Sequence, residues 1–193
     1  MKGINDLLPI LGFETSEDLL NGLKSFFLTK GFSWFDNQLI GLRTSDDYDN
    51  HFTDWILAVE GDNITAVTAS TKAGSYWLAT KAVATLKECQ YIDLWTKGQT
   101  AWSGDPYLQQ INNCDVYRDG LKSGSIDRDA PVEHGNFGIN FHSWKNFGEN
   151  LEVYNLSEGC QVTQEVENAA IFEVINDWEK ITYTLIFTPE FLS

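Results

Sequence analysis

The sequence predicts a mainly β protein with few helices. From Phe32 to about Val162, short runs of β-branched and aromatic residues alternate with turn residues, as in FTDWILAVE, GDN and ITAVTAS. Helical spacing of apolar residues occurs only near the two ends of the chain. The 193 residues, 42% of them hydrophobic, suffice for one domain with a full core.

The first predicted element is an amphipathic helix over residues 16–30. Thr15 or Ser16 can cap it, acidic residues follow in its first turn, and its leucines and phenylalanines recur at helical spacing. Gly31 after Lys30 is typical of a helix end. We expect residues 1–31 to form a helical segment packed on the core and residues 32–193 to form the main part of a single domain.

The middle of the chain predicts further strands at QYIDLWTKG, DVYRDG, FGINFH and LEVY. Residues 119–136 are polar and contain glycine, which predicts a surface loop that serves as a lid or a substrate wall. Ile171, Ile175 and Trp178 share one helical face, so residues 164–179 predict a second helix, and residues 181–187 predict a final strand.

The net charge of −15 comes from acidic residues scattered along the chain, so the folded surface should repel polyanions, and nucleic acid is not expected as a partner. No stretch approaches the roughly 18–20 apolar residues of a membrane span, and the N-terminus does not read as a secretory signal. We expect synthesis in a cytoplasm. The three cysteines are an odd number, which favours reduced thiols over a disulfide framework.

The segment NLSEGCQVTQ, residues 155–164, predicts a nucleophilic cysteine at Cys160. Thiol-based acyl transfer needs a thiolate, a base and backbone N–H groups that hold an oxyanion. His142 ends a predicted strand, and the predicted LEVY strand separates it from Cys160, so a hairpin would bring the two side chains together. Gly159 can adopt the turn that aims its own N–H and that of Cys160 at one point.

The stretch from His142 through Ser157, Glu158, Gly159 and Cys160 resembles the signature of the L,D-transpeptidase catalytic family, in a branch that includes phage-associated proteins. In that family a histidine is followed, after about this interval, by Ser/Thr-His-Gly-Cys. Two positions depart from the pattern: Glu158 stands where the family has its second histidine, and Val162 where it has arginine or asparagine.

The resemblance implies a β-sandwich-like catalytic core without a cofactor, acting on the stem peptides of peptidoglycan. Cys160 would be the nucleophile, His142 its base and Ser157 a supporting hydroxyl, beside Gly159. We expect Trp144, Glu158 and Gln161 to contact the substrate. A phage lysis or virion-associated role favours hydrolysis, as in an endolysin, over transfer to an amine.

Several alternatives stay open at this point. The protein could be a cross-linking transpeptidase, a family member that binds wall peptide without turnover, or a structural virion protein. Cys89 and Cys114 lack a neighbouring glycine turn or histidine, so we interpret both as structural. Glu133 and His134 with His142 and Cys160 could form a metal set, but no short ligand pair supports zinc.

Overall fold

The computed structural model describes residues 2–80, 83–99, 105–119, 124–143 and 152–193. Of these described residues, 39% lie in strands and 25% in helices, so the predicted mainly β class is confirmed. The predicted N-terminal helix is also present, and it begins and ends where the sequence indicates. Its cap Thr15 accepts a hydrogen bond from the Asp18 N–H, and Gly31 ends it with φ of 71°.

The helices are α1 (Ile4–Leu11), α2 (Ser16–Lys30), α3 (Ser75–Thr80), α4 (Glu165–Val174) and α5 (Thr188–Phe191). The first six strands are β1 (Asn37–Arg43), β2 (Asp54–Glu60), β3 (Asn63–Ser70), β4 (Val83–Leu86), β5 (Gln90–Gln99) and β6 (Pro106–Gln110). The remaining strands are β7 (Cys114–Asp119), β8 (Val132–Gly135), β9 (Phe141–Ser143), β10 (Gln161–Thr163) and β11 (Lys180–Phe187).

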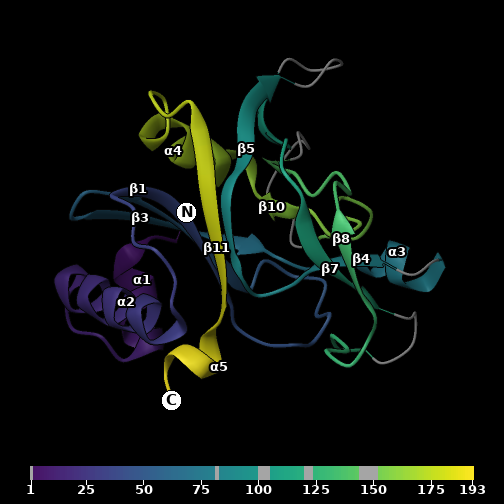
Figure 1. Cartoon of the computed structure of the whole chain (residues 1–193), viewed down its shortest axis with the longest axis horizontal. Coiled ribbons are helices and arrows are strands. Elements are labelled where there is room, and N and C mark those ends of the chain that lie inside the picture. The colour runs from purple at the N-terminus through teal and green to yellow at the C-terminus, as the bar shows by residue number, and fades with distance from the viewer. Residues whose placement is uncertain (1, 81–82, 100–104, 120–123, 144–151) are drawn as a thin grey trace.

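Eight strands close into a barrel in the order β1-β11-β5-β6-β9-β10-β3-β2 (Figure 1). Most neighbours are antiparallel, but β1 pairs with β11 in parallel, and β9 pairs with β10 in parallel. The parallel β1–β11 pair joins strands from opposite ends of the chain, with Leu39 opposite Tyr183. This pairing closes the sheet on itself and leaves it without an edge.

A second, three-stranded antiparallel sheet in the order β4-β7-β8 packs beside the barrel. Leu86, Cys114 and Val116 on one of its faces belong to the same buried cluster as the barrel interior. Figure 1 shows this small sheet on the opposite side of the barrel from α1 and α2. The barrel wall is therefore covered by helices on one side and by a sheet on the other.

Two hydrophobic clusters hold these layers. One contains the apolar side chains of α1 and α2 and those on the outer face of β1 and β2. The other fills the barrel and includes Trp95, Phe141 and Tyr183, with Ile171 and Ile175 of the α4 region packed on the same cluster. Burial of apolar area at about 25 cal/mol per Å² supplies the main driving force for both.

The structure corrects several predictions. The β-sandwich implied by the resemblance is not confirmed, because the strands close into one barrel. The predicted LEVY strand is wrong in its described part: Tyr154 has φ of 42°, and the Asn50 side chain accepts a hydrogen bond from its N–H in place of a ladder partner. FGINFH forms a strand only from Phe141, since Gly138 takes φ of 71°.

The helical content also differs from the prediction. α1, α3 and α5 were not expected, and α1 contains Pro9. The second predicted helix is shorter than expected, because α4 ends at Val174. Within the predicted surface loop, residues 132–135 form β8. Among the described residues, no helix has the length and apolar character required to cross a membrane.

Candidate active site

The parallel pairing of β9 and β10 relates the position of His142 to that of Cys160. His142 lies opposite Val162, and Phe141 lies opposite Gln161, which directly follows Cys160. Because side chains alternate between the faces of a strand, extending this register by one residue beyond Gln161 puts Cys160 on the outer face of the barrel that carries His142. The predicted hairpin is wrong, but the two side chains still share one face.

The turn before Cys160 is fixed by Ser157. The buried Ser157 hydroxyl donates to the Cys160 carbonyl oxygen over 2.9 Å and accepts from the Gly159 N–H over 3.0 Å. Since this bond engages the Gly159 N–H, that group is not the oxyanion donor expected from the sequence. Ser157 therefore acts by shaping the backbone on which Cys160 sits.

Gly159 is required by both conformation and space. Its φ of +140° lies in a region that L-amino acids rarely adopt, and a Cβ at this position would lie 2.0 Å from the Ala84 carbonyl oxygen. The Ala84 N–H in turn donates to the Glu158 carbonyl oxygen over 3.4 Å. The turn is thus pressed against β4 of the small sheet, and only glycine permits that approach.

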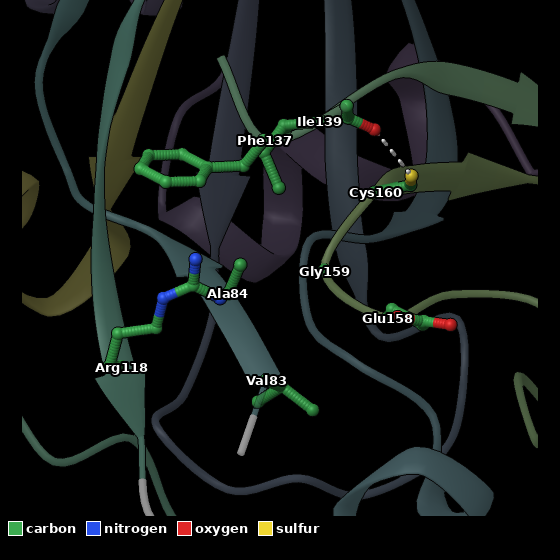
Figure 2. Close-up of a pocket in the computed structure, with 9 residues that line it drawn as sticks. Val83, Ala84, Arg118, Phe137, Ile139, Glu158, Gly159 and Cys160 are labelled. Atoms are coloured by element: carbon green, nitrogen blue, oxygen red, sulfur yellow. Dashed lines mark hydrogen bonds between the residues drawn. The ribbon is translucent and has the colours of Figure 1, made fainter. Parts of the chain in front are cut away.

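A pocket of about 240 Å³ opens where this turn meets the small sheet. Its walls come from β4, β7, residues 137–139 and residues 158–160, and Figure 2 shows the Cys160 sulfur and the Arg118 side chain on opposite walls. The half-buried Cys160 thiol donates a hydrogen bond to the Gly138 carbonyl oxygen over 3.4 Å. The thiol therefore lines a small concave site.

Residues 137–139, an irregular segment that forms one wall of the pocket, are held in place by side chains inside the barrel. The buried Trp95 indole N–H donates to the Ile139 carbonyl oxygen over 2.7 Å. The Gln110 side-chain oxygen accepts from the N–H groups of Phe137 and Ile139, over 3.2 and 2.7 Å. These bonds satisfy backbone groups that would otherwise be buried without partners, and they give the wall a fixed shape.

Both proposed reacting groups are neutral at neutral pH. Burial raises the pKa of the Cys160 thiol to about 11 and the Glu158 carboxylate adds to the rise, whereas the Asn140 and Cys160 backbone N–H groups oppose it. Burial lowers the pKa of His142 below its usual 6.5, partly offset by the bond between His142 Nδ1 and the Ser143 carbonyl oxygen at 3.2 Å. A proton on Nδ1 leaves Nε2 as an acceptor.

The other predicted site residues have different outcomes. Glu158 is exposed and lines the pocket. Gln161 is fully buried, accepts from the Tyr183 hydroxyl over 2.8 Å and donates to the Gly159 carbonyl oxygen, so its predicted contact with substrate is wrong. Because side chains alternate along a strand, the Gln161 side chain points into the barrel, whereas that of Cys160 points outward. Trp144 lies outside the described residues.

The alternative metal set is not assembled. His134 Nδ1 lies 2.7 Å from a carboxylate oxygen of Asp115, while Glu133 accepts from Arg118. Asp115 and His134 sit on the face of the small sheet opposite to Cys114, and hence away from Cys160. In the part of the chain that the structure describes, no three His, Cys, Asp or Glu side chains are grouped to hold a metal ion.

Sequence analysis missed Arg118 and Phe137 as pocket residues. Arg118 follows Cys114 and Val116 at alternate positions of β7, so it continues a buried apolar face with a charged residue. The signal that the sequence offers for this pocket residue is a cationic side chain at the end of a strand face that is otherwise apolar. Its relation to Cys160 could not be inferred, because the two belong to different sheets.

Comparisons with known proteins do not extend this description. No family model matches the sequence, and no curated protein matches it.

Proposed function

We propose that this protein is a cysteine-dependent acyl-transfer enzyme that hydrolyses stem peptides of peptidoglycan, as an L,D-peptidase of endolysin type. The observation that carries the proposal is the β9–β10 register, which relates His142 to the outer face of Cys160, while Cys160 itself lines a pocket. The resemblance of residues 142–160 to the L,D-transpeptidase signature supplies the substrate class and the bond attacked.

In this mechanism, Cys160 Sγ attacks the carbonyl carbon of the peptide bond while His142 Nε2 takes the thiol proton. The thiol is attacking from its neutral form, because at a pKa of about 11 only about one thiol in ten thousand is ionised at pH 7. Proton transfer and attack are therefore coupled, and no ion pair exists beforehand.

The tetrahedral intermediate then collapses to a thioester on Cys160, and the departing amine takes the proton from the His142 imidazolium. The backbone N–H groups of Cys160 and Asn140, which favour negative charge at the sulfur, are the available donors for the developing oxyanion. Water, deprotonated by His142, attacks the thioester and releases the acid and the free thiol. An amine in place of water would give the transpeptidase outcome.

A second candidate function is binding of wall peptides without turnover. Two observations favour it: Cys160 donates to the Gly138 carbonyl oxygen, and Glu158 contributes to the raised pKa of the thiol. Both hold the sulfur in its protonated form, which is the less nucleophilic one.

The two functions are separated by incubating the protein, Cys160→Ala and the control Cys89→Ala with defined muropeptides, with and without an added amino-acid acceptor. Mass spectrometry reads the products. Loss of a residue or a cross-link with the wild type and Cys89→Ala, but not with Cys160→Ala, supports the peptidase. Gain of the acceptor mass identifies transfer, and unchanged peptides that still bind would establish the second candidate.

The acid limb of the pH–rate profile tests the role of His142. Because the pKa of His142 is lowered, the neutral base persists below pH 6.5. kcat/KM should therefore keep its neutral-pH value down to below pH 6.5 before it falls. A profile whose acid limb lies above pH 6.5 would contradict the assignment of His142 as the base.

A further inference from the structure

Arg118 presents a cation to the pocket from the wall opposite Cys160. It lies on β7, on the face that carries Cys114 and Val116 toward the barrel, and it lines the pocket together with Cys160. Figure 2 shows its guanidinium directed into the pocket between Phe137 and Ala84. The position is notable in a chain whose net charge is −15.

The guanidinium is held in place but retains unused donors. Its Nε donates to a Glu133 carboxylate oxygen over 2.7 Å, and its central carbon lies 4.8 Å from the centroid of the Phe137 ring. Among the residues that the structure describes, neither Nη1 nor Nη2 has a hydrogen-bond partner. A planar group stacked on an aromatic ring, with its outer N–H groups open, is arranged to bind a carboxylate.

The other charged side chains described at the site, Glu133 and Glu158, are acidic, so Arg118 is the group there that can bind an anion. Glu133 occupies only Nε, and it is half exposed at a side-chain accessibility of 52%. Glu158 extends away from Arg118 in Figure 2. Among the described residues that line the pocket, Arg118 is the cation that an anionic ligand would meet, and Glu133 would be the competitor of that ligand.

We propose that Arg118 is a specificity-determining residue that binds a free carboxylate of the peptide substrate. The substrate class is then a peptide in which a free carboxylate lies close to the scissile carbonyl, so that one end is bound at Arg118 while the carbonyl reaches Cys160. The substrate part of this inference rests on the proposed function, whereas anion binding at Arg118 does not.

The first test uses two small electrophiles and needs no turnover. Iodoacetate is anionic and iodoacetamide is neutral. The ratio of their alkylation rates at one thiol therefore depends on the local charge, because the thiolate fraction is the same for both reagents and cancels. Peptide mapping by mass spectrometry gives the ratio at Cys160, relative to the ratio at Cys89. We expect the relative ratio to be about three- to tenfold higher at Cys160, from one nearby positive charge.

The variants sharpen this test. Arg118→Gln should remove the iodoacetate preference, and Glu133→Gln should increase it about twofold or more, because the competing carboxylate is lost. Lys180→Gln removes an exposed cation outside the pocket and should leave the ratio unchanged. Thermal melting verifies that each variant is folded. A ratio that is the same in the wild type and in a folded Arg118→Gln would overturn the proposal.

The second test measures binding of N-acetyl-L-lysyl-D-alanine and of its C-terminal amide to Cys160→Ala by titration calorimetry. The free acid should bind about tenfold more tightly than the amide, and Arg118→Gln should abolish this difference. Equal binding of acid and amide, together with muropeptide turnover by the wild type, would refute the inference and leave the proposed function standing. The iodoacetate preference without any turnover would refute the proposed function and leave the anion site standing.

Discussion

Cys114 and Cys160 are two free thiols that lie in different environments of the fold. Cys114, at the start of β7, is 1% exposed and accepts a hydrogen bond from the Gln110 amide inside the core. Cys160, just before β10, faces outward into a pocket and shares its face with a histidine. Burial raises the pKa of both thiols, to about 12 and about 11 respectively. A raised pKa therefore does not separate a structural thiol from a candidate nucleophile; access and neighbours do.

The largest expected difference between the two thiols is in turnover. Cys160→Ala should lower kcat on a muropeptide by about a thousandfold or more, since the atom that forms the thioester is removed. Cys114→Ala should keep kcat near the wild-type value and lower the free energy of unfolding by about 1–2 kcal/mol, through a small core cavity. Product formation and urea unfolding measure the two effects. Equal turnover losses in both variants would end the distinction.

Gly159→Ala tests whether the backbone before Cys160 depends on its glycine. The new Cβ would collide with the Ala84 carbonyl and adopt a forbidden φ, so we expect a loss of about 3 kcal/mol in the free energy of unfolding. Gly61→Ala is the matched control, with φ of 60° but no atom within 4 Å of its added Cβ, and should cost only about 1 kcal/mol. Similar losses in the two variants would show that the contact with β4 is not needed.

Alkylation by iodoacetamide should distinguish the thiols by pH. The rate at Cys160 should rise about tenfold per pH unit from pH 7 to pH 10, because only the thiolate reacts and the pKa is about 11. Cys114 should stay unmodified in the folded protein. A rate at Cys160 that levels off near pH 7 would indicate a preformed thiolate instead.

The same pKa values predict alkaline destabilisation. Both folded-state values exceed the 9.0 of an unperturbed thiol, so the folded state binds these protons more tightly than the unfolded state. Their contribution to stability is present below pH 9 and is lost as the pH rises toward 11 and 12. Cys114→Ala should reduce the part of this loss that belongs to the core thiol.

The smallest expected effect belongs to Glu158, the residue that departs from the family signature. Its carboxylate contributes to the raised pKa of Cys160, so Glu158→Gln should increase the iodoacetamide rate at pH 7 about two- to threefold. The effect should shrink at high salt, because Glu158 is exposed. An unchanged rate at low salt would remove Glu158 from the electrostatics of the site.

The parts of the fold that follow local patterns were predictable. The cap at Thr15 and the end at Gly31 fixed α2, and the apolar run at the C-terminal end fixed β11 to within one residue. Closure of the barrel was not predictable, because the β1–β11 pairing joins distant segments and leaves no local pattern. Strand alternation alone is compatible with a sandwich or a barrel.

The candidate site shows the same division. The short motif at residues 157–160 indicated the turn, and Ser157 and Gly159 do shape it. The relation of His142 to Cys160 comes from a parallel strand pair, where a hairpin was expected. The alternation of side chains along the two strands is what assigns both residues to one face. Gln161 was assigned to the wrong side because adjacent residues of a strand face opposite ways.

The bond between the Tyr183 hydroxyl and Gln161 also has a consequence for folding. β9 and β10 precede β11 in the chain, so the wall directly behind Cys160 is completed only when β11 joins the barrel. Pairing of distant segments is also slow relative to local folding. A folding intermediate that β11 has not yet joined thus carries its thiol without the assembled surroundings of the site, and any chemistry of that site begins only after the barrel has closed.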